Sequence, residues 1–179
     1  MWSFSVRASS LASLTIVSGG QTGADRAALD WALGRGVPHG GWCPCGRRAE
    51  DGVIDAHYRL TETPSSNYSQ RTEWNVRDSD ATLIVSVAPR LTGGSRATRE
   101  FARLHGKPCL HVFGDGAPAK VRRFLAQHRV RVLNVAGPRA SKESDVYALV
   151  IALLDRVFPS ASNRSGKQVR SVAAKLTAS

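Results

Sequence analysis

The sequence predicts a three-layer α/β protein, in which a mostly parallel sheet carries helices on both faces. Two observations support this fold class. Short apolar, β-branched runs alternate along the chain with segments whose apolar residues recur at helical spacing, and such alternation is typical of βαβ crossovers. The segment at residues 81–87 is also an uncharged, mostly apolar run, as expected of a strand that is buried on both faces.

The expected elements follow in chain order. An apolar run at residues 14–17 predicts the first strand, and Gly19, Gly20 and Gly23 separate it from a helix at 24–35. The later elements are a short strand region at 37–42, a helix at 68–77, a strand at 81–87, a helix at 96–105, a strand at 108–113, a helix at 118–128, a strand at 131–135 and a helix that ends near 158.

Length and composition favour one domain. The chain has 179 residues, of which 42% are hydrophobic, and this suits a single well-buried core. We expect the domain at 14–158, after a loose lead-in at 1–13 and before a basic, disordered tail at 159–179. No apolar run approaches the ~20 residues that span a bilayer, so no membrane partner is expected. Three cysteines do not make a disulfide framework, which favours a cytoplasmic location.

A long polar segment at residues 43–67 interrupts the alternation. Such segments inside compact domains are usually functional or disordered, and the aromatic residues in and beside this one favour order. Its Cys43 and Cys45, with His39 and His57 near in sequence, are a candidate metal set. The Cys-x-Cys spacing is tighter than that of common zinc sites. We therefore expect free thiols here rather than a metal site.

The net charge of +11 raises the question of a polyanion partner. Basic residues without any acid fill two segments, 120–131 and 160–179, but Phe124 is their only aromatic residue. A single-strand binder interleaves basic and aromatic residues. We therefore expect a solvated face and tail, and keep nucleic-acid contact as an alternative.

Three glycine-bearing turns follow expected strands, at residues 19–22, 92–95 and 137–141. In a parallel sheet these turns share one rim and lie at helix N-termini, whose amides and dipole favour anions. We therefore expect a small anionic ligand, a nucleotide or a phosphorylated heterocycle. The residues expected to bind it are Gly19, Gly20, Gln21, Thr22, Gly23, Arg47, Thr92, Gly93, Gly94, Ser95 and Arg139.

Acidic residues near these turns are candidates for acid/base catalysis, namely Glu100, Asp25 and Glu50. No pair of them has a spacing that requires such a role, and sequence order alone assembles no Ser/His/Asp set. Asp25 at a helix start can also simply interact favourably with the helix dipole. The sequence therefore leaves both a binding protein and an enzyme open.

Seven ordered motifs carry a family resemblance. They are Gly19-Gly-Gln-Thr-Gly-Ala-Asp-Arg26, His39-Gly-Gly-Trp-Cys-Pro44, Gly46-Arg-Arg-Ala-Glu-Asp-Gly52, Leu60-Thr-Glu-Thr-Pro64, Trp74-Asn-Val-Arg-Asp-Ser-Asp80, Leu91-Thr-Gly-Gly94 and Leu133-Asn-Val-Ala-Gly-Pro-Arg139. Over residues 14–158 the chain resembles the bacterial "putative molybdenum carrier" family, a circularly permuted branch of the SLOG, or lysine-decarboxylase-like, superfamily. The resemblance implies a Rossmann-like fold that binds a nucleotide-derived ligand at the glycine turns.

The resemblance implies two different functions. The family takes its name from carriers of molybdenum cofactor, which hold this pterin phosphate (molybdopterin) without changing it. The superfamily also contains phosphoribohydrolases with the motif Gly-Gly-x-Gly-Thr-x-x-Glu. Here Gly93-Gly-Ser-Arg-Ala-Thr-Arg-Glu100 keeps the leading glycines and the final acid, but Arg96 and Ala97 replace Gly-Thr. Cys45 is a second departure, because Lys is more common at that place in the family.

A homo-oligomer is also expected. Trp31, Trp42 and Trp74 would build an apolar contact face between copies, and burial of the same residues in the core is the alternative.

Overall fold

Five parallel strands form the central sheet of the protein. The structure is a computed structural model that describes residues 13–115 and 118–160, so most of the predicted lead-in and tail lie outside the described residues. The sheet order is β2-β1-β9-β7-β8. Its strands are β1 (Thr15–Val17), β2 (His39–Gly40), β7 (Ala81–Ser86), β8 (Cys109–Phe113) and β9 (Val132–Ala136). The predicted α/β class is confirmed.

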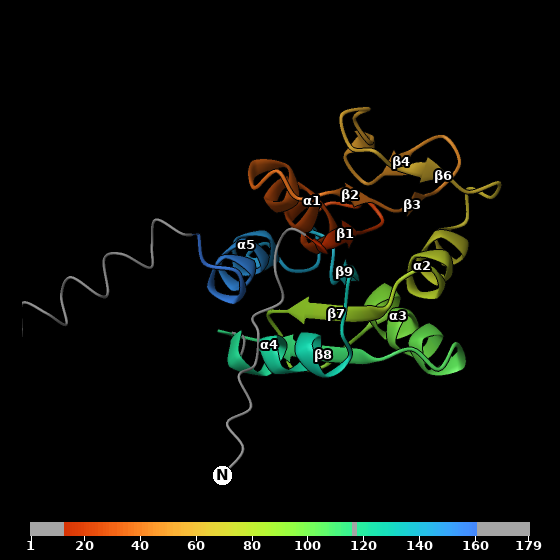
Figure 1. Cartoon of the computed structure of the whole chain (residues 1–179). Coiled ribbons are helices and arrows are strands. Elements are labelled where there is room, and N and C mark those ends of the chain that lie inside the picture. Colours follow the sequence, from red (N-terminus) through yellow and green to blue (C-terminus); the bar gives the residue numbers. More distant parts are fainter. Residues whose placement is uncertain (1–12, 116–117, 161–179) are drawn as a thin grey trace, which may run out of the picture.

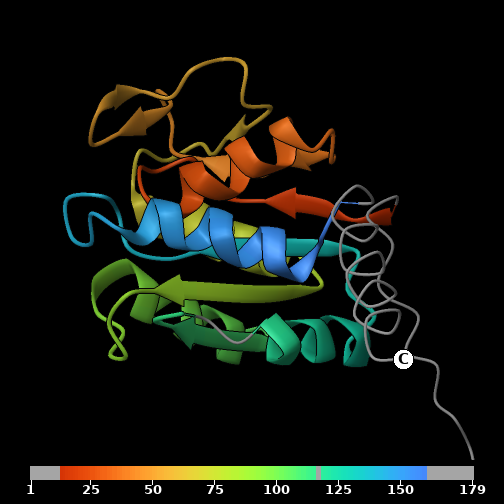
Figure 2. The same ribbon diagram turned by 90° about the vertical axis from the view of Figure 1, so that its left-hand side faces the viewer.

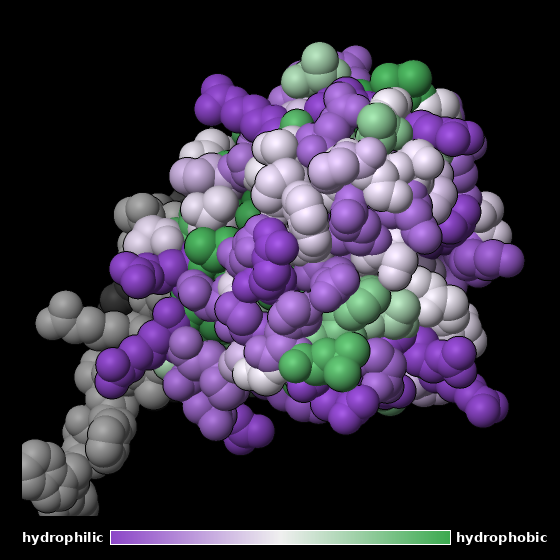
Figure 3. Space-filling view, turned by 90° about the vertical axis from the view of Figure 1, so that its right-hand side faces the viewer, coloured by the Kyte–Doolittle hydropathy of each residue, from purple (hydrophilic) through white to green (hydrophobic). Residues whose placement is uncertain are grey.

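Helices cover both faces of the sheet (Figures 1 and 2). One face carries α1 (Ala24–Gly34), α4 (Pro118–Gln127) and α5 (Val146–Val157), and the other carries α2 (Tyr68–Arg77) and α3 (Gly93–Leu104). The Asn67 side chain caps α2 by accepting from the Ser69 amide at 2.9 Å. The α2 and α3 side of the molecule is mostly hydrophilic (Figure 3), and α2 buries only Asn75 and Val76.

The main core lies between the central sheet and the helices α1 and α5. Every residue of β7 is buried, as its apolar run predicts, and α1 presents alanines that allow close packing. Trp31 is only 4% exposed, and its Nε1 donates to Asp155 at 3.0 Å. Trp31 is therefore a core residue and not part of an oligomer contact face.

Two other tryptophans remain partly accessible. Trp42 and Trp74 are half-buried and meet edge to face, with ring centroids 4.7 Å apart. Homo-oligomerisation stays a prediction, and these two residues are the ones that it would use.

The expected strand at 37–42 is divided in two. β2 belongs to the central sheet, whereas β3 (Trp42–Cys43) pairs with β6 (Thr61–Glu62) in a separate two-stranded sheet. Gly41 lies between them with φ 126°, and a Cβ there would come within 2.3 Å of the Ser18 carbonyl oxygen. The chain therefore leaves the central sheet at a position that only glycine fits.

The long segment after Cys43 is ordered, as its aromatic residues suggested. It follows β3 and contains β6 and an antiparallel hairpin formed by β4 (Arg48–Ala49) and β5 (Gly52–Val53). Strands of two residues carry no readable alternation, so the sequence did not predict them.

The start of α3 corrects a second prediction. Residues 93–95 were expected in a turn before a helix at 96–105, but the helix begins at Gly93. Thr92 has the extended conformation of an N-cap residue, with φ −131° and ψ 167°. The three residues of the expected turn are therefore the first turn of α3. None of the described helices is long and apolar enough to span a bilayer.

Candidate functional site

The three predicted turns meet at one pocket of about 400 Å³ at the carboxyl ends of the strands. The loops after β1, β7 and β9 all contribute to it, and α2 closes it from the side. The structure brings these predicted residues together in its lining: Gly19, Gln21, Asp25, Thr92, Gly93, Gly94, Ser95 and Arg139. Arg71 and Lys142 are two further cationic residues of the lining that were not predicted from the sequence.

The N-terminus of α3 is open toward this pocket. Its N-cap residue Thr92 makes no side-chain capping bond. A Cβ built at Gly93 or Gly94 would meet no atom within 4 Å, and Gly93 has φ 48°. The first amides of a helix have no partner within the helix, and the dipole places partial positive charge there. This end of α3 therefore suits an anion.

The turn after β1 has a different character, because several amides in and beside it already have partners within the protein. The Ala24 amide donates to the Pro138 carbonyl at 3.2 Å, and the Thr22 amide donates to Gln21 Oε1 at 3.0 Å. A Cβ at Gly23 would lie 2.6 Å from the same Pro138 oxygen.

Gly19 and Gly20 also serve packing within the protein. A Cβ at Gly19 would lie 1.5 Å from Arg71 Nη1, and one at Gly20 would lie 2.6 Å from Leu60 Cδ1. The glycines of this turn therefore allow protein segments to pack closely, whereas Gly93 and Gly94 of α3 have open space beside them. A ligand-binding role of this turn stays a prediction. Gly20, Thr22 and Gly23 do not line the pocket.

A buried ion pair lies beneath the turn. Arg71 Nη1 contacts Asp25 Oδ2 at 2.8 Å, and the two side chains are 13% and 5% exposed. Burial raises the pKa of Asp25, and the Arg71 guanidinium opposes that rise. The sequence interpretation missed Arg71, since it lies 46 residues from Asp25 and no local motif connects the two.

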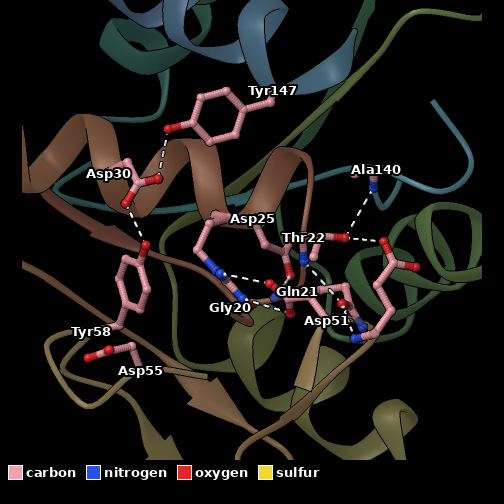
Figure 4. Close-up of polar contacts among 12 residues, drawn as sticks. Gly20, Gln21, Thr22, Asp25, Asp30, Asp51, Asp55, Tyr58, Ala140 and Tyr147 are labelled. Atoms are coloured by element: carbon pink, nitrogen blue, oxygen red, sulfur yellow. Dashed lines mark hydrogen bonds and ion pairs between the residues drawn. The ribbon is translucent and has the colours of Figure 1, made fainter. Parts of the chain in front are cut away.

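The Glu50 carboxylate binds the turn after β9 from within the protein. Its carboxylate accepts from the Ser141 hydroxyl at 2.6 Å and the Ser141 amide at 3.2 Å, and also from the Thr22 hydroxyl. Figure 4 shows Thr22 directed toward the Ala140 amide, which donates to it at 3.2 Å. Burial raises the pKa of Glu50, but the hydrogen bonds from Ser141 and Thr22 hold it below its ordinary value. This candidate acid therefore holds the β4–β5 hairpin against the turn.

Two further predicted residues lie outside the pocket. The Arg47 guanidinium donates to backbone carbonyls of the 43–67 segment, including Ile54 at 2.9 Å and Leu60 at 3.1 Å. Arg47 therefore braces that segment, and its role as a ligand cation stays a prediction. Glu100 is exposed on α3 and pairs with Arg103 at 3.2 Å.

The candidate metal residues are not brought together. Cys43 is buried, and Cys45 is exposed. His57 Nδ1 pairs with Asp55 at 2.8 Å, and His39 Nε2 accepts from the Arg59 amide at 3.3 Å. Within residues 13–115 and 118–160, no group of three or more His, Cys, Asp or Glu side chains could hold a metal ion.

A carboxylate with two tyrosines ties three elements together beside the site. Tyr58 donates to Asp30 Oδ1 at 2.6 Å, and Tyr147 donates to Asp30 Oδ2 at 2.7 Å, so Asp30 lies between the two rings in Figure 4. Burial and the Asp30 carboxylate raise the pKa of Tyr147 to about 12. The cluster fixes the 43–67 segment and α5 on α1.

The five-stranded parallel sheet with helices on both faces defines a Rossmann-like class of protein, and the pocket lies where such folds commonly bind ligands. More particularly, the chain belongs to the circularly permutated YpsA SLOG family, whose model matches residues 16–158. It is also similar to a solved structure of a putative molybdenum carrier protein from Syntrophus aciditrophicus. The two are 47% identical with a TM-score of 0.79, over 80% of this chain and 94% of the other. No curated protein matches the chain.

Proposed function

We propose that the protein binds a phosphorylated, nucleotide-derived ligand in the rim pocket and carries it unchanged. The observation that carries the proposal is the open N-terminus of α3, where Gly93 and Gly94 leave free space and Thr92 makes no capping bond. A phosphate placed there would accept from backbone amides and gain from the helix dipole. Arg139 and Lys142 in the same lining would add charge-assisted bonds.

Molybdenum cofactor is the first candidate cargo, because the similar Syntrophus protein is named as a molybdenum carrier. The cofactor is a pterin phosphate, and the N-terminus of α3 with Arg139 and Lys142 would bind its phosphate. No set of three metal-ligating side chains occurs among the described residues. We therefore propose that the cargo is held through its phosphate and its organic part. A cytoplasmic location stays part of this proposal.

A hydrolase remains the alternative, and its support is the position of Asp25. Of the three candidate acids, Asp25 lines the pocket, whereas Glu50 and Glu100 do not. An enzymatic reading therefore depends on Asp25.

The test begins with native mass spectrometry of the freshly purified full chain. Denaturation should release an intact pterin phosphate or nucleotide, identified by mass and fluorescence. Calorimetry of the emptied protein with the released compound, AMP and GMP should show saturable binding of at least one. Absence of both a copurified compound and saturable binding would contradict the proposal. Release of free base from a nucleoside monophosphate would favour the hydrolase instead.

A further inference from the structure

Two buried nitrogen atoms, on side chains that line the pocket, have no hydrogen-bond partner, and we call these two side chains the floor of the pocket. Across residues 13–115 and 118–160, the buried side-chain N and O atoms without a partner are Gln21 Nε2 and Arg71 Nε. Both residues line the pocket, and Gln21 is only 6% exposed. Because buried donors without acceptors are unfavourable and rare in folded proteins, two of them in one pocket point to an acceptor that a ligand brings.

The orientation of the Gln21 amide is fixed by its neighbours. Gln21 Oε1 accepts from the Thr22 amide at 3.0 Å and from the Glu50 amide at 2.9 Å. Turning the side-chain amide over would place its NH₂ group against two donors. Nε2 is therefore the end of the side chain that is left for a ligand.

The Arg71 guanidinium is also fixed in place. Its Nη1 donates to Asp25 at 2.8 Å. This nitrogen lies in the space that Gly19 leaves by having no Cβ. The Nε of the same guanidinium has no acceptor. Because Asp25 balances the charge of Arg71, the floor offers N–H donors without a net positive charge.

We propose that this floor is a second recognition point, in which Gln21 Nε2 and Arg71 Nε donate to an uncharged oxygen of the ligand. The proposal rests on the proposed function, which places the phosphate at the N-terminus of α3. Because the ion pair of Arg71 with Asp25 leaves the floor without a net positive charge to attract a second phosphate, the acceptor is a hydroxyl or carbonyl oxygen. The ligand class is thus a monophosphate whose organic part carries such an oxygen.

Two conservative variants test this proposal in the full chain. Arg71→Lys keeps a cation beside Asp25 but removes Nε, and Gln21→Glu keeps an oxygen for Thr22 and Glu50 but replaces Nε2. Calorimetry would compare ribose 5-phosphate and AMP with inorganic phosphate, which reaches only the α3 end. We expect each variant to bind at least one organic probe about tenfold more weakly than wild type, and inorganic phosphate within about threefold.

Nuclear magnetic resonance of the wild-type protein gives a measurement that depends on no variant. The side-chain N–H signals of Gln21 and Arg71 should shift when AMP or ribose 5-phosphate is added, and stay in place with inorganic phosphate. Unchanged affinities in both variants would overturn the inference, as would equal losses for organic and inorganic phosphate. Wild-type protein that binds none of the three probes would instead remove the proposed function itself.

Discussion

At the level of single residues, Asp25 and Arg71 form a buried ion pair. They lie 2.8 Å apart with little solvent around either side chain. Burial raises the pKa of Asp25, and Arg71 favours its charged form. Replacing a whole buried pair by apolar residues is often harmless, but removing one partner leaves an unpaired charge in the interior.

Arg71→Met should therefore lower the free energy of unfolding by about 3–5 kcal/mol near neutral pH. Without Arg71 the pKa of Asp25 rises further, so the folded state binds this proton more tightly than the unfolded state does. The difference in free energy of unfolding between wild type and Arg71→Met should then shrink as the pH falls through that raised pKa. Urea denaturation of the wild type and the variant at pH 7 and pH 5 measures this difference.

Arg103→Met is the matched control for this experiment. Arg103 pairs with Glu100 on the surface, where the side chains are 73% and 51% exposed, and such pairs contribute about 0–1 kcal/mol. A deficit in Arg71→Met that is as small as in this control, or that grows in acid, would contradict the account of the buried pair.

Two carboxylates, Glu50 and Asp51, connect the β4–β5 hairpin to the rest of the protein. Glu50 holds it to the turn after β9 through Ser141, and an ion pair between Arg26 and Asp51 at 3.2 Å adds a second connection. Because the pKa of Glu50 is lowered in the folded protein, this contribution is present above the ordinary pKa and is lost as the pH falls through the lowered one.

Glu50→Ala should release the hairpin without unfolding the sheet. Hydrogen exchange measured by mass spectrometry should become faster in residues 48–53 and at the Ser141 amide, with a stability loss of about 1–3 kcal/mol. Glu100→Ala, on an exposed helix face, should leave both regions unchanged. Equal exchange in the two variants would show that Glu50 does not hold the hairpin.

Most elements could be predicted because their signals are local. The helices expected at 24–35, 68–77 and 118–128 agree with α1, α2 and α4 within one residue, and the run at 81–87 is β7. Periodicity and glycine placement carry this information within each segment. The start of α3 was misplaced because glycines signal a turn in sequence, although the first helical turn tolerates them where a ligand approaches the backbone.

The position of the pocket could be predicted from the sequence, but the contacts among the side chains that form it could not. The rim of a parallel sheet is its common binding place, so three glycine turns were enough to locate the pocket. The partner of Asp25 and the acceptors of Arg47 depend on contacts across the fold, which no local pattern encodes. The structure alone therefore separates the packing glycine Gly19 from the open glycine Gly94.

At the scale of the whole molecule, strand order creates the pocket. β9 is the last strand in the chain but lies between β1 and β7, so the loops after these three strands are neighbours at one end of the sheet (Figure 2). That end collects the open α3 terminus, two cations and the Gln21 and Arg71 donors. We propose that a ligand phosphate binds at this end of the sheet.

The most direct test is a comparison of Gly94→Asp with Gly94→Asn. Both side chains have space, because nothing lies within 4 Å of the Cβ position, and a carboxylate near a helix N-terminus favours the helix. We predict that Gly94→Asp keeps its melting temperature but binds inorganic phosphate and AMP at least about tenfold more weakly than Gly94→Asn. Equal affinities in the two variants would contradict the claim that the phosphate binds at α3.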